Sequence, residues 1–248
     1  MTLKSVLVTG CSVGGIGFAL VEAFQKRNLH VFASARNLST MSQLEELPNV
    51  TLLPLDPTSA VSVQTAVESV RAQTGGTLDY LMNNAGQTII MPTLDFDIET
   101  ATKIRQRYPR QHKLYLYQRN YTLDGVTGIY AGSKAAMTAI TVALRLELAP
   151  FGVGVVTVNT GAVNTNTLAS GANFKLPAGS VYKSIKKEIA GRARGEDGTP
   201  RMEPSVYAEK VVGDVLGGAR GQIWRGGYAS IVRFALSKLP ISLSLSQS

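Results

Sequence analysis

The feature that most constrains the fold is a glycine-rich turn, Thr9–Gly17, that lies between a short apolar run and a helical pattern. The run Ser5–Thr9 is typical of a buried parallel strand. Glycines allow the backbone to turn tightly and to approach a pyrophosphate, which the N-terminal N–H groups of the following helix then bind. An ordinary strand–helix connection with chance glycines is the alternative. We therefore predict a dinucleotide-binding turn formed by Gly10, Ser12, Gly14, Gly15, Ile16 and Gly17.

Beyond the turn, short β-branched runs alternate with helical patterns, which is typical of repeated βαβ units. Further strands are expected at residues 30–34, 50–55, 78–82, 153–159 and 222–224, and helices at 16–27, 39–46, 58–72, 129–148, 181–193 and 204–216. There is no internal repeat and no linker. Residues 1–248 are thus predicted to form one α/β domain, a Rossmann-type, doubly wound parallel sheet with helices on both faces.

The end of the second predicted strand indicates which cofactor is bound. An acidic residue there binds the ribose 2′-hydroxyl of NAD, whereas a basic residue suits the 2′-phosphate of NADP. This end reads Ala33–Asn37 and contains Arg36 but no acidic residue. Arg36 offers a planar fork of donors to a phosphate, and a solvated surface arginine is the alternative. We predict NADP(H).

A tyrosine and a lysine, Tyr130 and Lys134, are four residues apart on one face of a predicted helix. A free tyrosine has a pKa near ~10 and is a poor acid–base group at neutral pH. A nearby positive charge favours the phenolate and lowers that pKa. Such a tyrosine can give a proton to a carbonyl oxygen as hydride reaches the carbon. Taken alone, this spacing is more often an ordinary surface pair.

Together these motifs resemble the short-chain dehydrogenase/reductase family. The turn resembles TGxxxGxG with one extra residue, Gly14 or Gly15, while Asn83–Gly86 matches NNAG and Tyr130–Lys134 matches YxxxK. The form of the turn is similar to a fungal branch of NADPH-dependent 1-acyl-dihydroxyacetone-phosphate reductases that also includes enzymes of secondary metabolism. The resemblance implies reduction of a ketone, or oxidation of a secondary alcohol, on a hydrophobic lipid- or polyketide-like substrate.

The resemblance also implies roles for single residues. Tyr130 is then the catalytic acid/base, while Lys134 binds the nicotinamide ribose and tunes the tyrosine. The run Gly161–Thr165 stands where the family has PGxVxT, and the loop after it would cover the substrate. No metal site is predicted. The cofactor-binding residues implied beyond the turn are Arg36, Asp56, Asn83, Asn84, Gly86, Tyr130, Lys134, Val163 and Thr165.

The resemblance fails in an atypical segment, residues 99–128. The family has a serine shortly before the tyrosine and an asparagine in the preceding helix. This chain has no serine between Ser69 and Ser133, and Thr122 and Thr127 are the hydroxyl candidates. Asn120 is the only asparagine from Lys103 to Tyr130, and it does not fall in a helical pattern. Losing one donor to a developing oxyanion typically costs on the order of 10²–10³ in rate. A non-catalytic dinucleotide-binding protein, or a defective product, is therefore the alternative function.

The same segment carries most of the net charge of +8, because Lys103–Arg119 holds six basic residues and no acidic residue. Residues 97–108 are expected to form at most a truncated helix. Residues 114–117 are expected to form at most a residual strand, without the apolar pattern that a central strand needs. A missed splice boundary, a reading-frame change and genuine divergence each explain the run. We predict no nucleic-acid partner, because the run lacks a binding motif.

Residues 226–248 form an apolar C-terminal segment that carries Arg233 and Lys238. Such a segment suits contact with a membrane or a lipid-like surface, and packing in the core or in a homo-oligomer is the alternative. Cys11 is the only cysteine, no apolar run spans a bilayer, and the N-terminus does not resemble a signal peptide. We predict a cytoplasmic protein, with association at a lipid or endoplasmic reticulum surface as the added alternative.

Overall fold

A computed structural model of the chain describes residues 3–86, 90–95, 115–119, 127–166 and 174–238. Within these residues, seven strands form one parallel sheet in the order β3-β2-β1-β4-β5-β6-β7. The strands are β1 Ser5–Thr9, β2 His30–Ala35, β3 Val50–Pro54, β4 Tyr80–Asn83, β5 Tyr115–Arg119, β6 Val156–Thr160 and β7 Gly221–Arg225. Strand order reverses between β1 and β4, and ligands of open parallel sheets bind beyond the carboxyl ends of the strands at such a point.

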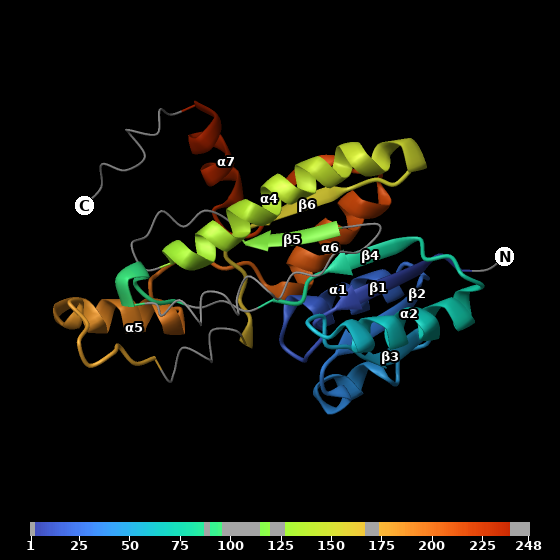
Figure 1. The fold of residues 1–248 in the computed structure, drawn as a ribbon, viewed down its shortest axis with the longest axis horizontal. Helices are drawn as coiled ribbons and strands as arrows, with labels where there is room; N and C mark the ends of the chain where they lie inside the picture. Colours follow the sequence, from blue (N-terminus) through green and yellow to red (C-terminus); the bar gives the residue numbers. More distant parts are fainter. Residues whose placement is uncertain (1–2, 87–89, 96–114, 120–126, 167–173, 239–248) are drawn as a thin grey trace.

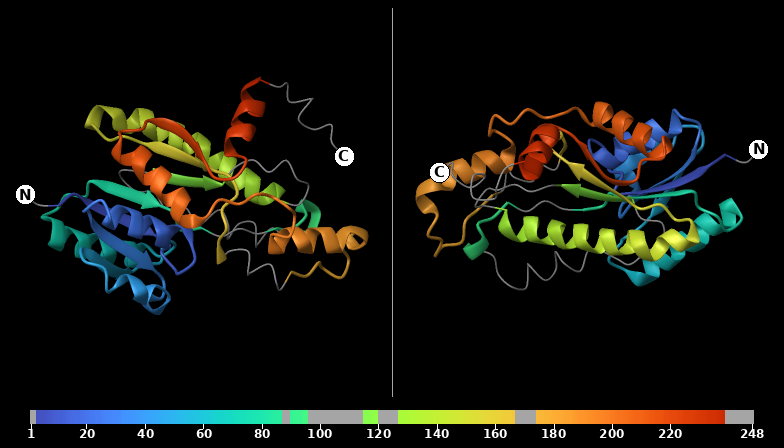
Figure 2. Two further views of the ribbon diagram at one scale, coloured as in Figure 1. Left: turned by 180° about the vertical axis from the view of Figure 1, so that it is seen from behind. Right: turned by 90° about the horizontal axis from the view of Figure 1, so that it is seen from above.

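Helices cover both faces of this sheet, as Figure 1 and the view from above in Figure 2 show. One face is covered by α1 and α6, which contact each other, and the other by α2 and α4. The predicted α/β architecture is confirmed. The α-helices within the described residues are α1 Ile16–Gln25, α2 Ala60–Thr74, α4 Gly128–Leu148, α5 Lys186–Arg194, α6 Pro204–Leu216 and α7 Ala229–Lys238.

The two faces of β1 explain why both need a helical cover. Val6 and Val8 point into the large apolar cluster that includes residues of α1 and α6. Leu7 points to the opposite face, where it packs in a second cluster with Val70 of α2. Because side chains alternate along a strand, a run that is apolar at every position must be buried on both sides.

The strand β5 corrects one expectation. The sequence Tyr115–Arg119 lacks the apolar pattern expected of a central strand, yet it lies between β4 and β6. All five of its residues pair in register with β6, whereas only Tyr115 and Leu116 pair with β4. The position of β5 in the sheet is therefore explained by its backbone pairing with β6 and by the strand propensity of tyrosine. The truncated helix expected at 97–108 lies outside the described residues.

Two expected helices are shorter or tighter than their sequence patterns indicate. The pattern at 39–46 forms a 3₁₀ segment, η1 Leu38–Leu44, which begins where the Asn37 side chain accepts a hydrogen bond from the Ser39 N–H. The pattern at 181–193 becomes a 3₁₀ turn, η5 Lys183–Ile185, followed by α5. Two further 3₁₀ turns within the described residues are η2 Thr93–Asp95 and η3 Ala149–Phe151. Among the described helices, none has both the length and the hydropathy of a membrane span.

Candidate active site

The glycine-rich turn leaves β1 in a conformation that only glycine adopts easily. Gly10 has φ +73°, and a Cβ there would lie 2.8 Å from the Ala85 Cα. The N–H groups of Gly10 and Cys11 both donate to the Ser34 carbonyl, at 2.8 and 3.0 Å. A Cβ on Gly17 would run into the Gly10 carbonyl oxygen. The turn therefore depends on close backbone contact with both β2 and the end of β4.

The N-terminus of α1 is suited to an anion. The helix begins after Gly15, which has no side chain to cap it, and its first turn contains no acidic residue. By contrast, α2 is capped by the Ser59 side chain. The first N–H groups of a helix lack intrahelical partners and carry partial positive charge. A pyrophosphate fits this position, because it supplies the acceptors that α1 lacks.

The end of β2 lies beside the turn. Arg36 is exposed and lines the same cavity as the turn. The Ser12 hydroxyl is 3.0 Å from the Thr40 hydroxyl, and the Val13 N–H donates to the Thr40 carbonyl at 2.8 Å. These contacts hold η1 and the end of β2 next to the glycine-rich turn. A 2′-phosphate fits here, because the basic side chain stands close to the turn and no acidic residue follows β2.

The residues after β3 and β4 complete this side of the cavity. Asp56 accepts hydrogen bonds from the Thr58 N–H and hydroxyl, at 2.9 and 2.8 Å. Asn84 donates from Nδ2 to the carbonyls of Thr9 and Gly10, at 2.8 and 3.1 Å. Asn84 therefore ties the β4 end to the glycine-rich turn as well as lining the cavity. Asn83 does not line it, and its Nδ2 is buried with no hydrogen-bond partner among the described residues.

Tyr130 and Lys134 face the cavity from the first two turns of α4. Their exposed fractions are only 5% and 4%. The Lys134 ammonium lies 5.5 Å from the centroid of the Tyr130 ring. The ammonium also faces Gly86, where a Cβ would be 3.8 Å from it. The cation, the phenol and the end of β4 are thus brought together in a largely buried environment.

The loop that follows β6, Gly161–Asn166, forms the facing side of the cavity. Ala162 exchanges backbone hydrogen bonds with Gly227, at 2.8 and 3.0 Å. Its carbonyl also accepts from the Met202 N–H, while the Asn164 N–H donates to the Met202 carbonyl at 2.9 Å. Val163, between these residues, is buried. Two distant segments therefore fix the backbone that carries Val163 and Thr165.

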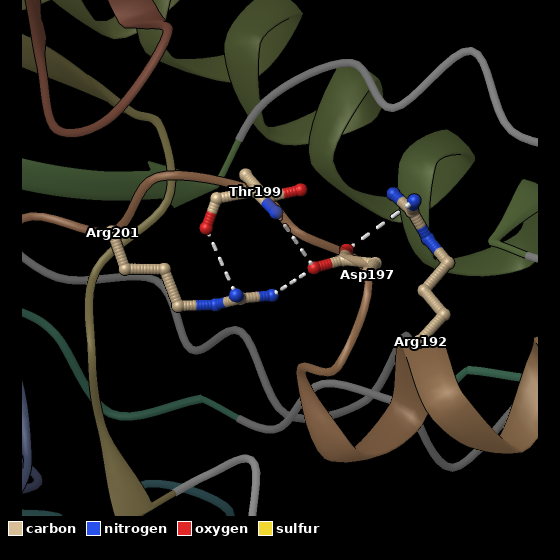
Figure 3. A network of polar contacts seen from close by, with 4 residues as sticks. All are labelled: Arg192, Asp197, Thr199 and Arg201. Carbon is tan, nitrogen blue, oxygen red and sulfur yellow. Dashed lines mark hydrogen bonds and ion pairs between the residues drawn. The ribbon is translucent and has the colours of Figure 1, made fainter.

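A charged network supports the Met202 segment (Figure 3). The Asp197 carboxylate accepts a hydrogen bond from Arg201 at 2.5 Å and forms an ion pair with Arg192 at 3.6 Å. The Thr199 N–H donates to the same carboxylate at 3.2 Å. Burial opposes ionisation of Asp197, but the bonds from Arg201 and Thr199 outweigh it and lower the carboxyl pKa. The network holds the chain between α5 and α6 in place.

These elements enclose a cavity of about 500 Å³, a size typical of small-ligand sites. It brings together twelve of the predicted residues: Gly10, Ser12, Gly15, Ile16, Arg36, Asp56, Asn84, Gly86, Tyr130, Lys134, Val163 and Thr165. Three predicted residues, Gly14, Gly17 and Asn83, do not line it. Gly17 instead provides close packing against Gly10, and Gly14 lies against Asn166.

Sequence reasoning missed two polar residues of this cavity, Thr58 and Asn166. Thr58 follows Asp56 in an Asp-x-Thr order that favours the local turn seen here, so a sequence signal existed. Asn166 had no comparable signal, because its partners are 153 positions away. Of the two hydroxyl candidates, Thr127 is buried at the start of α4, whereas Thr122 lies outside the described residues. Asn120 also lies outside them.

Cys11 lies in the turn but is chemically protected. Burial raises the pKa of its thiol to about 12, and a backbone hydrogen bond at Ser34 offsets this only in part. Its Sγ donates to the Val8 carbonyl at 3.1 Å. Because the thiolate is the reactive form, Cys11 acts as a small apolar residue of the core.

Comparison with known proteins agrees with this arrangement. A model of the family described as short chain dehydrogenase matches residues 4–106 and 124–174. The short-chain dehydrogenase ptmH of Penicillium ochrochloron is 42% identical over 258 aligned positions, which cover 97% of this chain and 94% of the relative. The NADPH-dependent 1-acyldihydroxyacetone phosphate reductase of Schizosaccharomyces pombe is 32% identical, with coverage of 97% and 91%.

Solved structures share the fold at lower identity. A short-chain dehydrogenase from Streptomyces avermitilis superposes with a TM-score of 0.76 at 21% identity, covering 98% of this chain and 95% of that one. A short-chain dehydrogenase from Burkholderia cenocepacia, in complex with NADP, superposes with a TM-score of 0.73 at 20% identity, and each chain is covered completely. These structures establish the common architecture.

Proposed function

The chain belongs to the short-chain dehydrogenase family, and from this premise we propose that it is an NADP(H)-dependent oxidoreductase acting on a ketone or a secondary alcohol. The observation that carries the proposal is the single cavity shared by the phosphate-binding turn, Arg36, and the Tyr130/Lys134 pair. Anion-binding groups lie at one end and an acid–base pair at the other, as a dinucleotide-dependent reaction requires.

Arg36 supports the choice of NADP(H) over NAD(H). It stands at the end of β2, where an acidic residue would bind the 2′-hydroxyl of NAD. A guanidinium gives a 2′-phosphate charge-assisted hydrogen bonds. The relative from Schizosaccharomyces pombe is named as NADPH-dependent, which agrees with this preference.

Tyr130 would supply the proton. When bound, a nicotinamide cofactor gives a hydride to the substrate carbon or takes one from it. During reduction, the Tyr130 hydroxyl donates its proton to the carbonyl oxygen, and during oxidation the phenolate accepts it. Lys134 stabilises the negatively charged form, because its ammonium lies 5.5 Å from the ring centroid in a buried environment. The Val163–Thr165 backbone would orient the carboxamide end of the cofactor.

A hydrophobic, lipid- or polyketide-like substrate is supported by exposed apolar side chains beyond the carboxyl ends of the strands. The Ser180 hydroxyl donates to Asp95 at 2.6 Å and joins η2 to the segment before α5 (Figure 1). Leu94 and Val181 adjoin this bond and are both exposed. An apolar chain on the substrate would cover them, and the name of the Schizosaccharomyces relative specifies an acylated substrate.

The second candidate function is non-catalytic dinucleotide binding, and a specific observation favours it. The chain has no serine between Ser69 and Ser133 to hydrogen-bond a substrate carbonyl. The alignment with the Penicillium relative spans 258 positions, more than the 248 residues of this chain, so it includes positions that this chain lacks. Without that donor, stabilisation of the developing oxyanion is reduced.

One experiment separates the two functions. NADPH binding is measured by fluorescence titration, and NADPH oxidation is followed with a panel of apolar ketones, for wild type and Tyr130→Phe. We expect Tyr130→Phe to lower turnover by about 10²–10⁴-fold while the Kd for NADPH stays within about twofold. Binding without turnover in the wild type would select the second function, and equal turnover in both proteins would refute the role of Tyr130.

We also propose that the protein forms a homo-oligomer through α4. The outer face of this helix is apolar, and Ile140 and Leu146 are 56% and 68% exposed. Ala135, Ala139 and Ala143 on the same side are exposed as well and allow a second helix to approach closely. A Leu146→Glu variant should shift the mass measured by light scattering to that of a monomer, and an unchanged mass would contradict the proposal.

A cytoplasmic location with peripheral contact to a lipid surface completes the proposal. The single thiol suits a reducing compartment. On α7, Ile231 and Phe234 are exposed beside Arg233, a combination that suits the interface of an anionic membrane. Sedimentation with anionic vesicles tests the contact, and Phe234→Ser should weaken it.

A further inference from the structure

The glycine-rich turn and the loop after β6 meet at Asn166. The backbone N–H of Asn166 donates to the Gly14 carbonyl at 3.1 Å. Its side-chain Nδ2 donates to the Val13 carbonyl, also at 3.1 Å. These two hydrogen bonds are called the Asn166 contact below. A Cβ on Gly14 would run into the Asn166 amide, so the two residues pack tightly as well.

The contact explains how the turn accommodates its extra residue. Gly15 immediately precedes α1, whereas Gly14 has φ +71° and lies outside the cavity lining. An anion-binding turn directs N–H groups at its ligand, and the carbonyls of the turn then need donors elsewhere. Asn166 supplies donors to two successive carbonyls, those of Val13 and Gly14. The added residue is therefore matched by a partner from the opposite side of the cavity.

The loop that carries Asn166 is itself fixed. Its neighbour Asn164 donates from the backbone to Met202, and Ala162 is bound to both Met202 and Gly227. The Asn166 contact therefore connects the turn to a loop that is hydrogen-bonded to Met202 and Gly227. Ser12 and Val13 line the cavity on one side of the contact, and Val163 and Thr165 line it on the other.

We propose that Asn166 is a positioning residue for NADP(H), an inference that rests on the cofactor proposed above. It joins the turn that binds the pyrophosphate to the loop that receives the nicotinamide. It thereby holds both parts of the site at one separation before the cofactor arrives. Preorganisation of this kind improves affinity by reducing the ordering that binding requires.

The expected effect of losing the side chain is a faster release of the cofactor. Asn166→Ala removes the bond to Val13 and keeps the backbone bond to Gly14. One hydrogen bond of this kind corresponds to a rise in Kd of about threefold to tenfold. The change should appear mainly in the dissociation rate. Asn166→Asp should bind NADPH no more tightly than Asn166→Ala, because a carboxylate cannot donate to the Val13 carbonyl and repels a pyrophosphate.

The test compares wild type, Asn166→Ala, Asn166→Asp and the control Asn164→Ala. Asn164 is a matched control, because its side chain is exposed, donates to Glu203 at 3.3 Å and does not line the cavity. NADPH affinity is measured by fluorescence titration, its release by stopped-flow displacement, and folding by thermal unfolding. We expect the Asn166 variants to release NADPH faster at an unchanged unfolding midpoint, while Asn164→Ala matches wild type.

A double-mutant cycle with Gly14→Ala tests the contact itself. The strain of a left-handed alanine is present in both backgrounds and cancels, but the collision with the Asn166 amide exists only when asparagine is present. Gly14→Ala should therefore weaken NADPH binding less in the Asn166→Ala background than in wild type. Equal losses in both backgrounds would overturn the proposed coupling.

The outcomes distinguish this inference from the function on which it rests. If wild type binds NADPH and Asn166→Ala binds and releases it identically, only the role of Asn166 is overturned. Tighter binding by Asn166→Ala also overturns that role, because the contact would then obstruct the cofactor. If wild type does not bind NADPH, the proposed function fails and the inference fails with it.

Discussion

The two sides of the cavity are held in place by very different means. The phosphate side, formed by residues 10–16, Arg36, Asp56 and Asn84, rests on the largest apolar cluster and on bonds that join β1, β2 and β4. The other side, which we propose to be catalytic and call the catalytic side, is formed by Tyr130, Lys134, Val163 and Thr165 and depends on α4. That helix packs through Met137 against Val155 in a small cluster and leaves its outer face exposed.

This difference indicates that binding and turnover can change independently. Hydrogen bonds between neighbouring strand ends fix the phosphate side, so the proposed cofactor binding depends on the best-packed part of the fold. The catalytic side depends on one helix and on a loop held by distant segments, so smaller changes should alter it. Five predictions test this contrast, and they run from the largest expected effect to the smallest.

Gly17→Val should abolish cofactor binding. The added side chain would run into the Gly10 carbonyl and displace the turn from β4. We expect the Kd for NADPH to rise more than about 100-fold, with a lower unfolding midpoint. Gly132→Ala is the matched control, because a Cβ there meets nothing within 4 Å and alanine favours a helix. Normal binding by Gly17→Val would show that the close approach is not required.

Arg36→Ala should weaken NADPH binding by about 10–100-fold, the value of one charge-assisted contact to a phosphate. The Kd for NADH should stay within about twofold, because NADH carries no 2′-phosphate. Arg71→Ala, a change on α2 away from the cavity, serves as the control. A parallel loss of affinity for both cofactors would contradict the assigned role of Arg36.

Asp197→Asn should lower turnover, which depends on the catalytic side, more than it lowers NADPH affinity, which depends on the phosphate side. Removing the charge between Arg192 and Arg201 loosens the segment that carries Met202, so turnover should fall a few-fold, on the order of one weakened charged contact. NADPH affinity should change less than turnover. An equal loss in both quantities would show that the two sides are not independent.

Asp197 also predicts a dependence of stability on pH. Its pKa is lower in the folded protein than in the unfolded chain, so the carboxylate stabilises the fold at neutral pH. This contribution is lost as the pH falls through the lowered pKa. The unfolding midpoint of wild type should therefore drop more steeply on acidification than that of Asp197→Asn, and parallel curves would argue against the network.

The smallest expected effect is the labelling of the Cys11 thiol in the folded protein. With its thiol pKa raised to about 12 by burial, the folded protein should not react with a disulfide reagent at pH 8. The unfolded chain should react with one equivalent of the reagent, since Cys11 is the only cysteine. Rapid labelling of the folded protein would show that the turn opens readily. The phosphate side would then not be the more firmly held side of the cavity.

Much of the site could be predicted from the sequence, because its parts are encoded locally. The glycines between a predicted strand and a predicted helix indicate the turn Thr9–Gly17. The spacing of Tyr130 and Lys134 places both on one helical face. Arg36 follows from its place at the end of a strand. Each of these predictions needs only neighbouring residues and the periodicity of one element.

Other features depend on where distant elements meet. β5 lies in the centre of the sheet because it pairs with β6 along its whole length, although its sequence lacks the apolar pattern of such a strand. Asn84 serves the packing of the turn as much as the cavity, whereas Asn83 does not line the cavity. No local pattern indicates the pairing of β5 or the hydrogen bonds of Asn84, because both join segments that are far apart in the sequence.

The glycine-rich turn shows both kinds of information at once. By itself, the sequence determined that a glycine-rich turn follows the first strand, that it has one residue more than the family pattern, and that a basic residue follows the second strand; binding of a dinucleotide there stays a prediction. Only the tertiary structure decided that Gly14 adopts the left-handed conformation and that Asn166, 153 positions beyond Val13, donates to the carbonyls of Val13 and Gly14. Local periodicity specifies an element, whereas the packing of the whole sheet selects which distant donors come within hydrogen-bonding distance.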